Sequence, residues 1–331
     1  QKSSARLPNC SSSFVSGDGL LMTNWHCAEE AVQSLSTAQR DLYKNGFYAT
    51  TYAQELKTGL NVRVLMQIRE KGVKVDGLLC EDVTFYLGGL QQSYCYKVYN
   101  DIRLVLALER SVGFFGGDAD NFEFPRYTLD MAFLRAYEND KPAQTPNHFT
   151  WSNAGPKPDE LIFVSGHPGS TKRMLTSEAL KTERDMRVPF LLDTFRRREM
   201  TLQQYMLRGD EQKRIAVSDL FSWQNSRKLY VGKIRGLQDV RMLQSKVDFE
   251  QKVLSEANSA DRSEFNEGLR LVQDAQRAIK NFYTYWALTV RGLGLDSQIF
   301  GAENRSALNL EYEEAKLRDS LTQMIEIFGA N

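Results

Sequence analysis

The sequence predicts a protein with two parts, antiparallel strands over residues 1–172 and helices over residues 173–331. In the first part, short apolar runs alternate with turns that contain glycine, proline or aspartate, which is typical of antiparallel strands. In the second part, proline occurs once between residues 176 and 286. Apolar residues there recur three and four positions apart, which is the period of an amphipathic helix.

The strands are predicted from runs rich in valine, isoleucine and leucine. Ser12–Val15 and Leu20–Thr23 flank the turn Gly17–Gly19, and together they predict a hairpin because glycine adopts the backbone conformations that tight turns need. Further strands are predicted at residues 61–65, 102–106, 131–134 and 161–164.

The composition limits the possible partners. The chain has 331 residues, of which 42% are hydrophobic and 25% charged, as in an ordinary globular protein. Lysine plus arginine equals aspartate plus glutamate, at 42 each. This neutral balance gives no support for a nucleic-acid partner or an anionic membrane surface. No apolar run approaches the roughly 20 residues that a membrane helix needs.

The stretch from Cys10 to Cys27 carries the first candidate for chemistry, His26. A lone histidine beside a cysteine is most often an ordinary loop or core residue, but here a predicted hairpin leads from one cysteine to the sequence Thr-x-x-His-Cys. This arrangement resembles the pattern around the catalytic histidine of chymotrypsin-like peptidases. We predict a disulfide between Cys10 and Cys27, which would hold the backbone beside His26. Whether Cys80 and Cys95 also pair is left open by the sequence.

Asp130 is the second candidate, because it immediately precedes the apolar strand predicted at residues 131–134. An aspartate in this place could merely cap the strand. It could also accept the ring N–H of His26, fix the tautomer of the imidazole and stabilise the imidazolium that forms during proton transfer. The order of histidine before aspartate along the chain favours the second interpretation.

The run at residues 161–164 leads into Ser165-Gly166-His167-Pro168-Gly169-Ser170. This segment is similar to the opening strand of the second barrel in chymotrypsin-like peptidases. The G-x-S-x-G spacing of a nucleophile elbow is absent. We therefore interpret Ser165 and Ser170 as structural residues, and His148 and His167 as loop histidines.

Taken together, these motifs resemble the bacterial dipeptidyl peptidase 7 and dipeptidyl peptidase 11 family of serine exopeptidases. The histidine motif spans Ser13–Cys27, and Gly116–Asp130 resembles the family's aspartate motif, which is the most specific match. Asn45–Ala49 and the segment Gln224–Gly232 also resemble family sequences. The resemblance covers nearly the whole chain.

The resemblance implies a fold of β plus α class, a chymotrypsin-like antiparallel double β-barrel with an inserted helical domain. Residues 1–172 would form the first barrel and the start of the second, which is incomplete in this chain, and residues 173–331 a helical lid. The implied enzyme releases dipeptides from peptides with a free N-terminus, is periplasmic or secreted, and is a homodimer. No cofactor and no metal are expected.

The family's site residues carry over to five positions. His26 would be the general base and Asp130 its orienting partner. Asn121 and Asn225 would hold the free α-amino group of the substrate, since an amide oxygen accepts a hydrogen bond from an ammonium group without adding a full charge. Phe122 stands where the family typically has tryptophan, so its ring would still wall the pocket but lacks the indole N–H donor.

The sequence departs from the family in three further places. Trp25 and Tyr127 stand where the family has histidines that are not members of the triad. The family's Gly-Asn-Ser-Gly-Ser-Pro-like nucleophile motif follows the helical insertion, and no such segment occurs in these 331 residues. We therefore expect a partial chain that is inactive alone because its nucleophilic serine lies elsewhere. A catalytically inactive peptide-binding relative and a helical dimerisation scaffold are the alternatives.

Overall fold

The computed structural model of the chain describes residues 1–8, 10–37, 39–114, 121, 123–125, 127–167, 172–289 and 310–329. The chain divides into two compact units. The first comprises Gln1–Gly116 and Pro125–Met174, and the second comprises Gly117–Phe124 and Leu175–Asn331. The short segment Gly117–Phe124 thus leaves the strand-rich unit and belongs to the helical one, which the sequence did not indicate.

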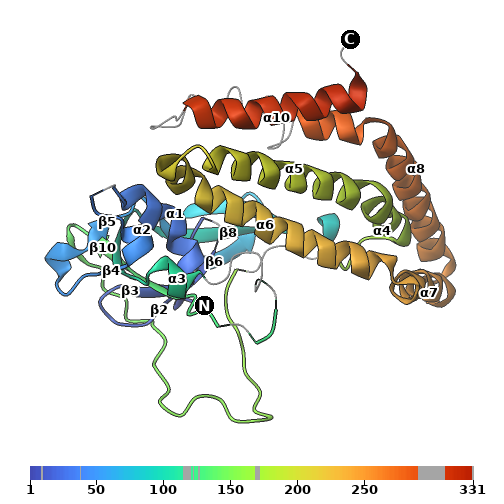
Figure 1. The fold of residues 1–331 in the computed structure, drawn as a ribbon. Coiled ribbons are helices and arrows are strands. Elements are labelled where there is room, and N and C mark those ends of the chain that lie inside the picture. The colour runs from blue at the N-terminus through green and yellow to red at the C-terminus, as the bar shows by residue number, and fades with distance from the viewer. Residues whose placement is uncertain are drawn as a thin grey trace. The chain divides into compact units, whose positions relative to one another are not determined.

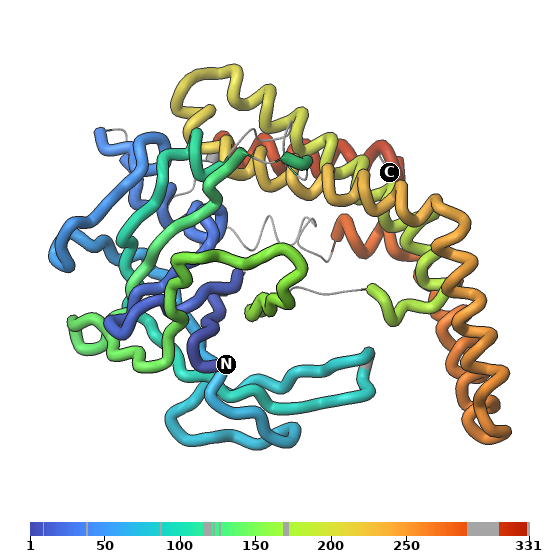
Figure 2. The backbone as a smooth tube through the Cα atoms, turned by 90° about the horizontal axis from the view of Figure 1, so that it is seen from below, coloured from blue at the N-terminus to red at the C-terminus, as the bar shows by residue number. Residues whose placement is uncertain are grey.

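The first unit is built around an antiparallel sheet (Figure 1). Its strands follow the order β4-β9-β10-β3-β2-β1-β6-β8-β7, with β11 paired to β10 and β5 paired to β9. Strands β7 and β8 form a long hairpin (Figure 2). The strands are β1 (Ser4–Arg6), β2 (Ser11–Phe14), β3 (Leu20–Thr23), β4 (Phe47–Tyr48), β5 (Leu56–Lys57), β6 (Val62–Glu70), β7 (Leu79–Phe85), β8 (Leu90–Tyr99), β9 (Asp101–Ala107), β10 (Ala132–Glu138) and β11 (Lys141–Pro142).

The predicted hairpin is confirmed, because β2 and β3 pair with Phe14 opposite Leu21. Both side chains are buried, so this hairpin contributes directly to the core of the unit. Gly19 in its turn has a φ of +77°, and a Cβ atom there would lie 2.7 Å from the carbonyl oxygen of Ala136. Only glycine avoids this contact, which explains why the turn next to β10 carries it.

Short helices surround the sheet of the first unit. The longest, α1, begins directly after β3, and the sequence did not predict it. Its buried residues Trp25, Ala28, Ala31 and Val32 recur at helical spacing, so one apolar stripe faces the core. The helices are α1 (Trp25–Leu35), α2 (Leu42–Asn45), η1 (Tyr52–Gln54), η2 (Tyr86–Gly88) and α3 (Arg110–Gly113).

The strand predicted at residues 161–164 is not formed. The segment has irregular backbone and lacks a ladder partner among the described residues, and the side chains of Phe163 and Val164 are 88% and 93% exposed. Apolar β-branched residues favour a strand, but a strand also needs a neighbour that satisfies its backbone groups. The observed sheet is one continuous antiparallel path, and the predicted double barrel stays a prediction.

The second unit is helical, as the sequence predicts, and two of its helices, α5 and α6, lie side by side (Figure 1). One core cluster centres on Leu202, Tyr205 and Leu220, and another on Val188 and Leu237. None of the helices among the described residues could cross a membrane. The helices are α4 (Ser177–Thr182), η3 (Glu183–Arg187), α5 (Val188–Met206), α6 (Asp210–Gln238), α7 (Val240–Glu256), α8 (Ser259–Thr289) and α10 (Leu310–Phe328).

Candidate active site

The candidate active site lies where β3 passes into α1, beside the start of β10. The ladder pairs Thr23 of β3 with Ala132 of β10. This register brings the residues that follow Thr23 next to those that precede Ala132, although more than a hundred residues separate them in the chain. His26, in the first turn of α1, therefore meets Asp130 because of the backbone pairing.

Asp130 and His26 are joined by two hydrogen bonds. Oδ2 of Asp130 lies 2.7 Å from Nδ1 of the His26 ring, within the range that the predicted role requires. Oδ1 of Asp130 accepts the backbone N–H of His26 at 3.0 Å. The same carboxylate also accepts from the side-chain amide of Asn24 at 3.2 Å. One carboxylate thus fixes both the backbone and the ring of the candidate base.

The hydrogen bonds also set the ionisation of Asp130. Burial alone would raise the pKa of this carboxyl, but the bonds from the ring and backbone of His26 and from Asn24 outweigh burial and lower it below its ordinary value. Asp130 is therefore an anion at neutral pH. Half of the His26 side chain remains exposed, so the imidazole is held on one side by Asp130 and is accessible to a reacting group.

The carboxylate of Asp130, and not the side chain of Asn24, caps the first turn of α1. Asn24 occupies the N-cap position, where asparagine normally accepts a hydrogen bond from the first turn of the helix. Its side chain makes no such bond and contacts Asp130 instead. The carboxylate of Asp130 accepts the His26 N–H in its place, and a negative charge at a helix N-terminus is favourable. Asn24 is a site residue that sequence reasoning missed, although its position before a helical stripe was a signal.

Trp25 anchors the start of α1 in the core. It is fully buried, and its indole N–H donates to the carbonyl oxygen of Leu108 at 2.8 Å. Its ring packs against Tyr43 with centroids 5.5 Å apart. On another side the ring lies so close to Gly113 that a Cβ atom there would be 2.4 Å from Trp25 Cδ1. The residue before His26 therefore has little freedom, which limits the backbone positions open to His26.

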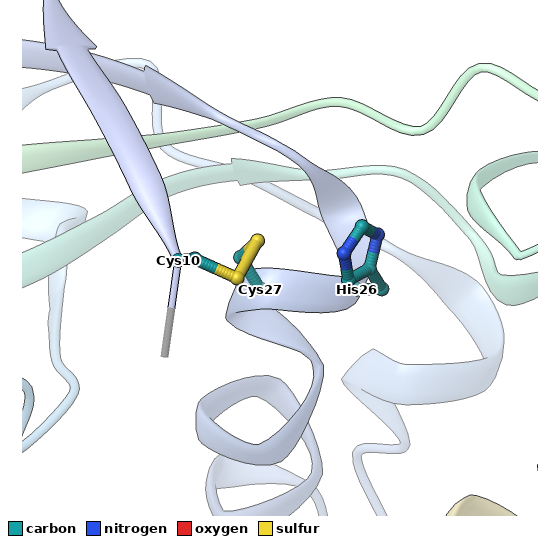
Figure 3. Close-up of side chains that lie close together, drawn as sticks. All are labelled: Cys10, His26 and Cys27. Carbon is teal, nitrogen blue, oxygen red and sulfur yellow. A yellow bond between two sulfur atoms is a disulfide. The ribbon is translucent and has the colours of Figure 1, made fainter. Parts of the chain in front are cut away.

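The predicted disulfide between Cys10 and Cys27 is confirmed, with Cα atoms 5.9 Å apart. Figure 3 shows the disulfide and the His26 ring at the start of α1. Both sulfur atoms lie close to a ring nitrogen of His26, a grouping that could suggest a metal site. A disulfide offers no thiolate, so this pair braces the helix start and is not a ligand set. Cys80 and Cys95, whose pairing the sequence left open, are also bridged.

The second unit brings Asn121 and Asn225 together, although they are 104 positions apart in the sequence. The side-chain amide of Asn121 donates to Oδ1 of Asn225 at 2.8 Å. Asn121 is buried, with 5% of its surface exposed. Because Asn121 is the donor in this contact, its own Oδ1 keeps the capacity to accept from a further group. Phe122, the third predicted binding residue, lies outside the described residues.

The remaining candidates are in the first unit. The hydroxyl of Ser165 is bonded to that of Ser4 at 2.9 Å, in keeping with the structural role that we predict for it. The ring of His148 contacts the carbonyl oxygen of Thr145 at 3.0 Å. Burial, together with the charge of Arg6, lowers the pKa of His167, so this histidine is neutral at pH 7. Ser170 lies outside the described residues.

Comparison with known proteins identifies the class. The chain matches the family Peptidase S46 over residues 1–76 and 63–323, and it belongs to that family. It is 25% identical over 325 residues to dipeptidyl-peptidase 7 of Phocaeicola vulgatus. The aligned region covers 82% of this chain and 44% of that protein. It is 33% identical over 223 residues to the Asp/Glu-specific dipeptidyl-peptidase of Shewanella putrefaciens, which covers 54% of this chain and 30% of that protein.

The fold is similar to that of solved members of the same group. The crystal structure of Porphyromonas endodontalis DPP11 in complex with the dipeptide Arg-Asp superimposes with a TM-score of 0.80 at 21% sequence identity, over 99% of this chain and 55% of that one. A structure of the same protein in complex with substrate gives a TM-score of 0.79. The chain therefore spans about half the length of the relatives that it matches.

Proposed function

We propose that this chain is the part of a serine-type dipeptidyl peptidase that supplies the general base. The hydrogen bond of 2.7 Å between Asp130 and a half-exposed His26 is the observation that carries the proposal. Membership of Peptidase S46, together with the names of the relatives, supports dipeptide release as the reaction.

In the proposed mechanism, Nε2 of His26 takes the proton of a serine hydroxyl as the serine oxygen attacks the substrate carbonyl. His26 then becomes an imidazolium, and Asp130 stabilises its charge through Nδ1. The proton passes on to the leaving amine, and water later releases the acyl group by the same base catalysis. Because the pKa of Asp130 is lowered, its negative charge is present at the pH at which His26 must act.

The nucleophilic serine belongs to the Gly-Asn-Ser-Gly-Ser-Pro-like motif of the family, which these 331 residues do not contain. We place it in a portion of the protein beyond this chain, in line with the share of the relatives that the chain spans. The same proposal includes a chymotrypsin-like double barrel completed by that portion. A homodimer and a periplasmic or secreted location follow from the family resemblance.

Asn121 and Asn225 are proposed to hold the free α-amino group of the peptide. Their direct hydrogen bond supports this role, because it uses the amide N–H of Asn121 and leaves its Oδ1 able to accept from the α-amino group. A buried oxygen of this kind discriminates strongly between an ammonium group and an acetylated amine, since the blocked substrate leaves it unpaired. The side chain of Phe122 would line the same pocket.

The proposal is tested with the full-length protein and one hexapeptide in free and N-acetylated forms. Mass spectrometry of the products should show successive dipeptides from the free peptide and almost no cleavage of the acetylated one. Release of single amino acids, or cleavage of both peptides at internal bonds, would contradict the proposal that the enzyme removes dipeptides from a free N-terminus.

A further inference from the structure

The second unit contains a cavity between the helices α4 and η3 and the helix α8. It measures about 310 Å³ and is lined by η3 and α4 on one side and by α8 on the other. Helix α8 contributes Ile279, Phe282, Tyr283 and Trp286, which makes one wall largely aromatic. The size is at the lower end of the range of about 300–1,000 Å³ typical of small-molecule pockets.

The opposite wall contains an irregular helical turn. Residues Glu183–Arg187 form a π-helix between α4 and α5. Such turns are rare and occur frequently at functional sites. Here the turn supplies both charged residues of the cavity wall, Glu183 and Arg187.

The ion-pair cluster to which these two residues belong carries a net charge. The side chain of Glu183 is only 3% exposed and is bonded to two cations, Arg187 at 2.5 Å and Lys233 at 2.6 Å. Lys233 does not line the cavity, but the three groups together carry one excess positive charge, because two cations pair with one carboxylate. The guanidinium of Arg187 also lies over the ring of Tyr283, 5.3 Å from its centroid. Its Nε–H is buried without a hydrogen-bond partner among the described residues.

We propose that this cavity binds a small aromatic carboxylate. The aromatic ring would lie among Phe282, Tyr283 and Trp286, and the carboxylate would accept hydrogen bonds from the guanidinium of Arg187. An anion offsets the excess positive charge and gives Arg187 an acceptor that the protein does not fully supply. A cation of the same shape is repelled, and a neutral aromatic molecule gains only the ring contacts.

The test uses indole-3-propionate and the neutral indole-3-propionamide as probes, titrated calorimetrically into the full-length protein. We expect the acid to bind at least about tenfold more tightly than the amide, since a charge-assisted hydrogen bond contributes this much. Arg187→Met should remove that difference and leave the affinity of the amide unchanged. Equal binding of acid and amide to the unmodified protein, or full retention of the preference in Arg187→Met, would overturn the proposal.

Two further variants separate the cavity from general effects of charge and folding. Arg208 also lies over a tyrosine, 5.4 Å from the centroid of Tyr205, and pairs with Glu311 at 2.6 Å, but it lines another cavity. Arg208→Met should keep the preference for the acid, and its loss there would place the ligand elsewhere. Ile279→Trp fills the cavity while keeping Arg187, so it should abolish binding of both probes. Undiminished binding to a folded Ile279→Trp protein would contradict the assignment.

Discussion

Asp130 in the first unit and Asp319 in the second are both largely withdrawn from water, yet their ionisation shifts in opposite directions. The pKa of Asp130 is lowered, because hydrogen bonds from His26 and Asn24 outweigh its burial. The pKa of Asp319 is raised, because burial outweighs its attraction to Arg198, which lies 3.3 Å away. Burial also lowers the pKa of Arg198. The hydrogen bonds from His26 and Asn24 thus outweigh burial at Asp130, whereas Arg198, Arg197 and Thr201 together do not outweigh it at Asp319.

The two units also differ in the interactions that hold their polar groups in place. In the first unit, the disulfide between Cys10 and Cys27 and a strand register place the polar site. The second unit contains none of the chain's four cysteines, and beside its apolar clusters it has ion pairs between helices, such as Arg198 with Asp319. We therefore expect the catalytic step, which needs one fixed geometry, to use the first unit. We expect the second unit to bind ligands whose charged groups pair with its ionic side chains.

The largest effect is expected from Asp130→Asn in the full-length protein. Asparagine is close in shape to aspartate but favours the wrong tautomer of His26, so turnover should fall by about 10⁴-fold while the fold is kept. Steady-state kinetics with a dipeptide substrate and circular dichroism would measure both. Asp319→Asn is the matched control and should leave turnover within a few-fold of the unmodified protein, relative to the amount of folded protein. Similar losses in the two variants would mean that Asp130 acts only on stability.

Removing the disulfide tests how the first unit holds its site. The double variant Cys10→Ser with Cys27→Ser opens a loop of 17 residues and should lower the free energy of unfolding by about 3 kcal/mol. Urea unfolding followed by hydrogen exchange should place the loss in the first unit. Cys80→Ser with Cys95→Ser opens a loop of similar length and is the control. Only the first pair should also reduce turnover under conditions where both proteins are folded, and equal turnover would contradict the bracing role.

Asn121→Ala probes the second unit's part in substrate recognition. It removes an acceptor for the α-amino group but no proton-transfer group, so kcat/KM for a free peptide should fall by about 10²-fold. The weak activity on an acetylated peptide should stay the same. Asn266→Ala, an exposed asparagine on α8, is the control and should change neither value. A proportional loss on both peptides would show that Asn121 does not recognise the amine.

The smallest effect is expected from Asn24→Ala. It removes one donor to Asp130 and should lower the free energy of unfolding at neutral pH by about 1 kcal/mol. Because the pKa of Asp130 is lower in the folded state, its contribution to stability is present above the unfolded value of 3.8 and is lost as the pH falls through the folded pKa. The variant should raise that folded pKa and so begin acid unfolding at a higher pH. An unchanged acid transition would contradict this.

The sequence predicts the broad plan and the principal residues, because strands and helices carry different periods and because His26 and Asp130 lie in recognisable motifs. It does not predict every partner that long-range pairing creates. Asn24 contacts Asp130 only through the register of β3 with β10, and Cys80 faces Cys95 through that of β7 with β8. The prediction of a strand at residues 161–164 was also wrong because of long-range pairing. A segment with strand propensity forms a strand only where another strand pairs with it.

The role of His26 as the base that activates a serine is the central claim, and covalent labelling tests it most directly. A fluorophosphonate probe reacts with a serine whose hydroxyl is deprotonated by a neighbouring base. The full-length protein should be labelled rapidly. Both the His26→Ala variant, with an unchanged unfolding transition, and the 331-residue chain alone should remain unlabelled. Labelling of the folded His26→Ala variant at the unmodified rate would show that another group activates the nucleophile and would contradict the account.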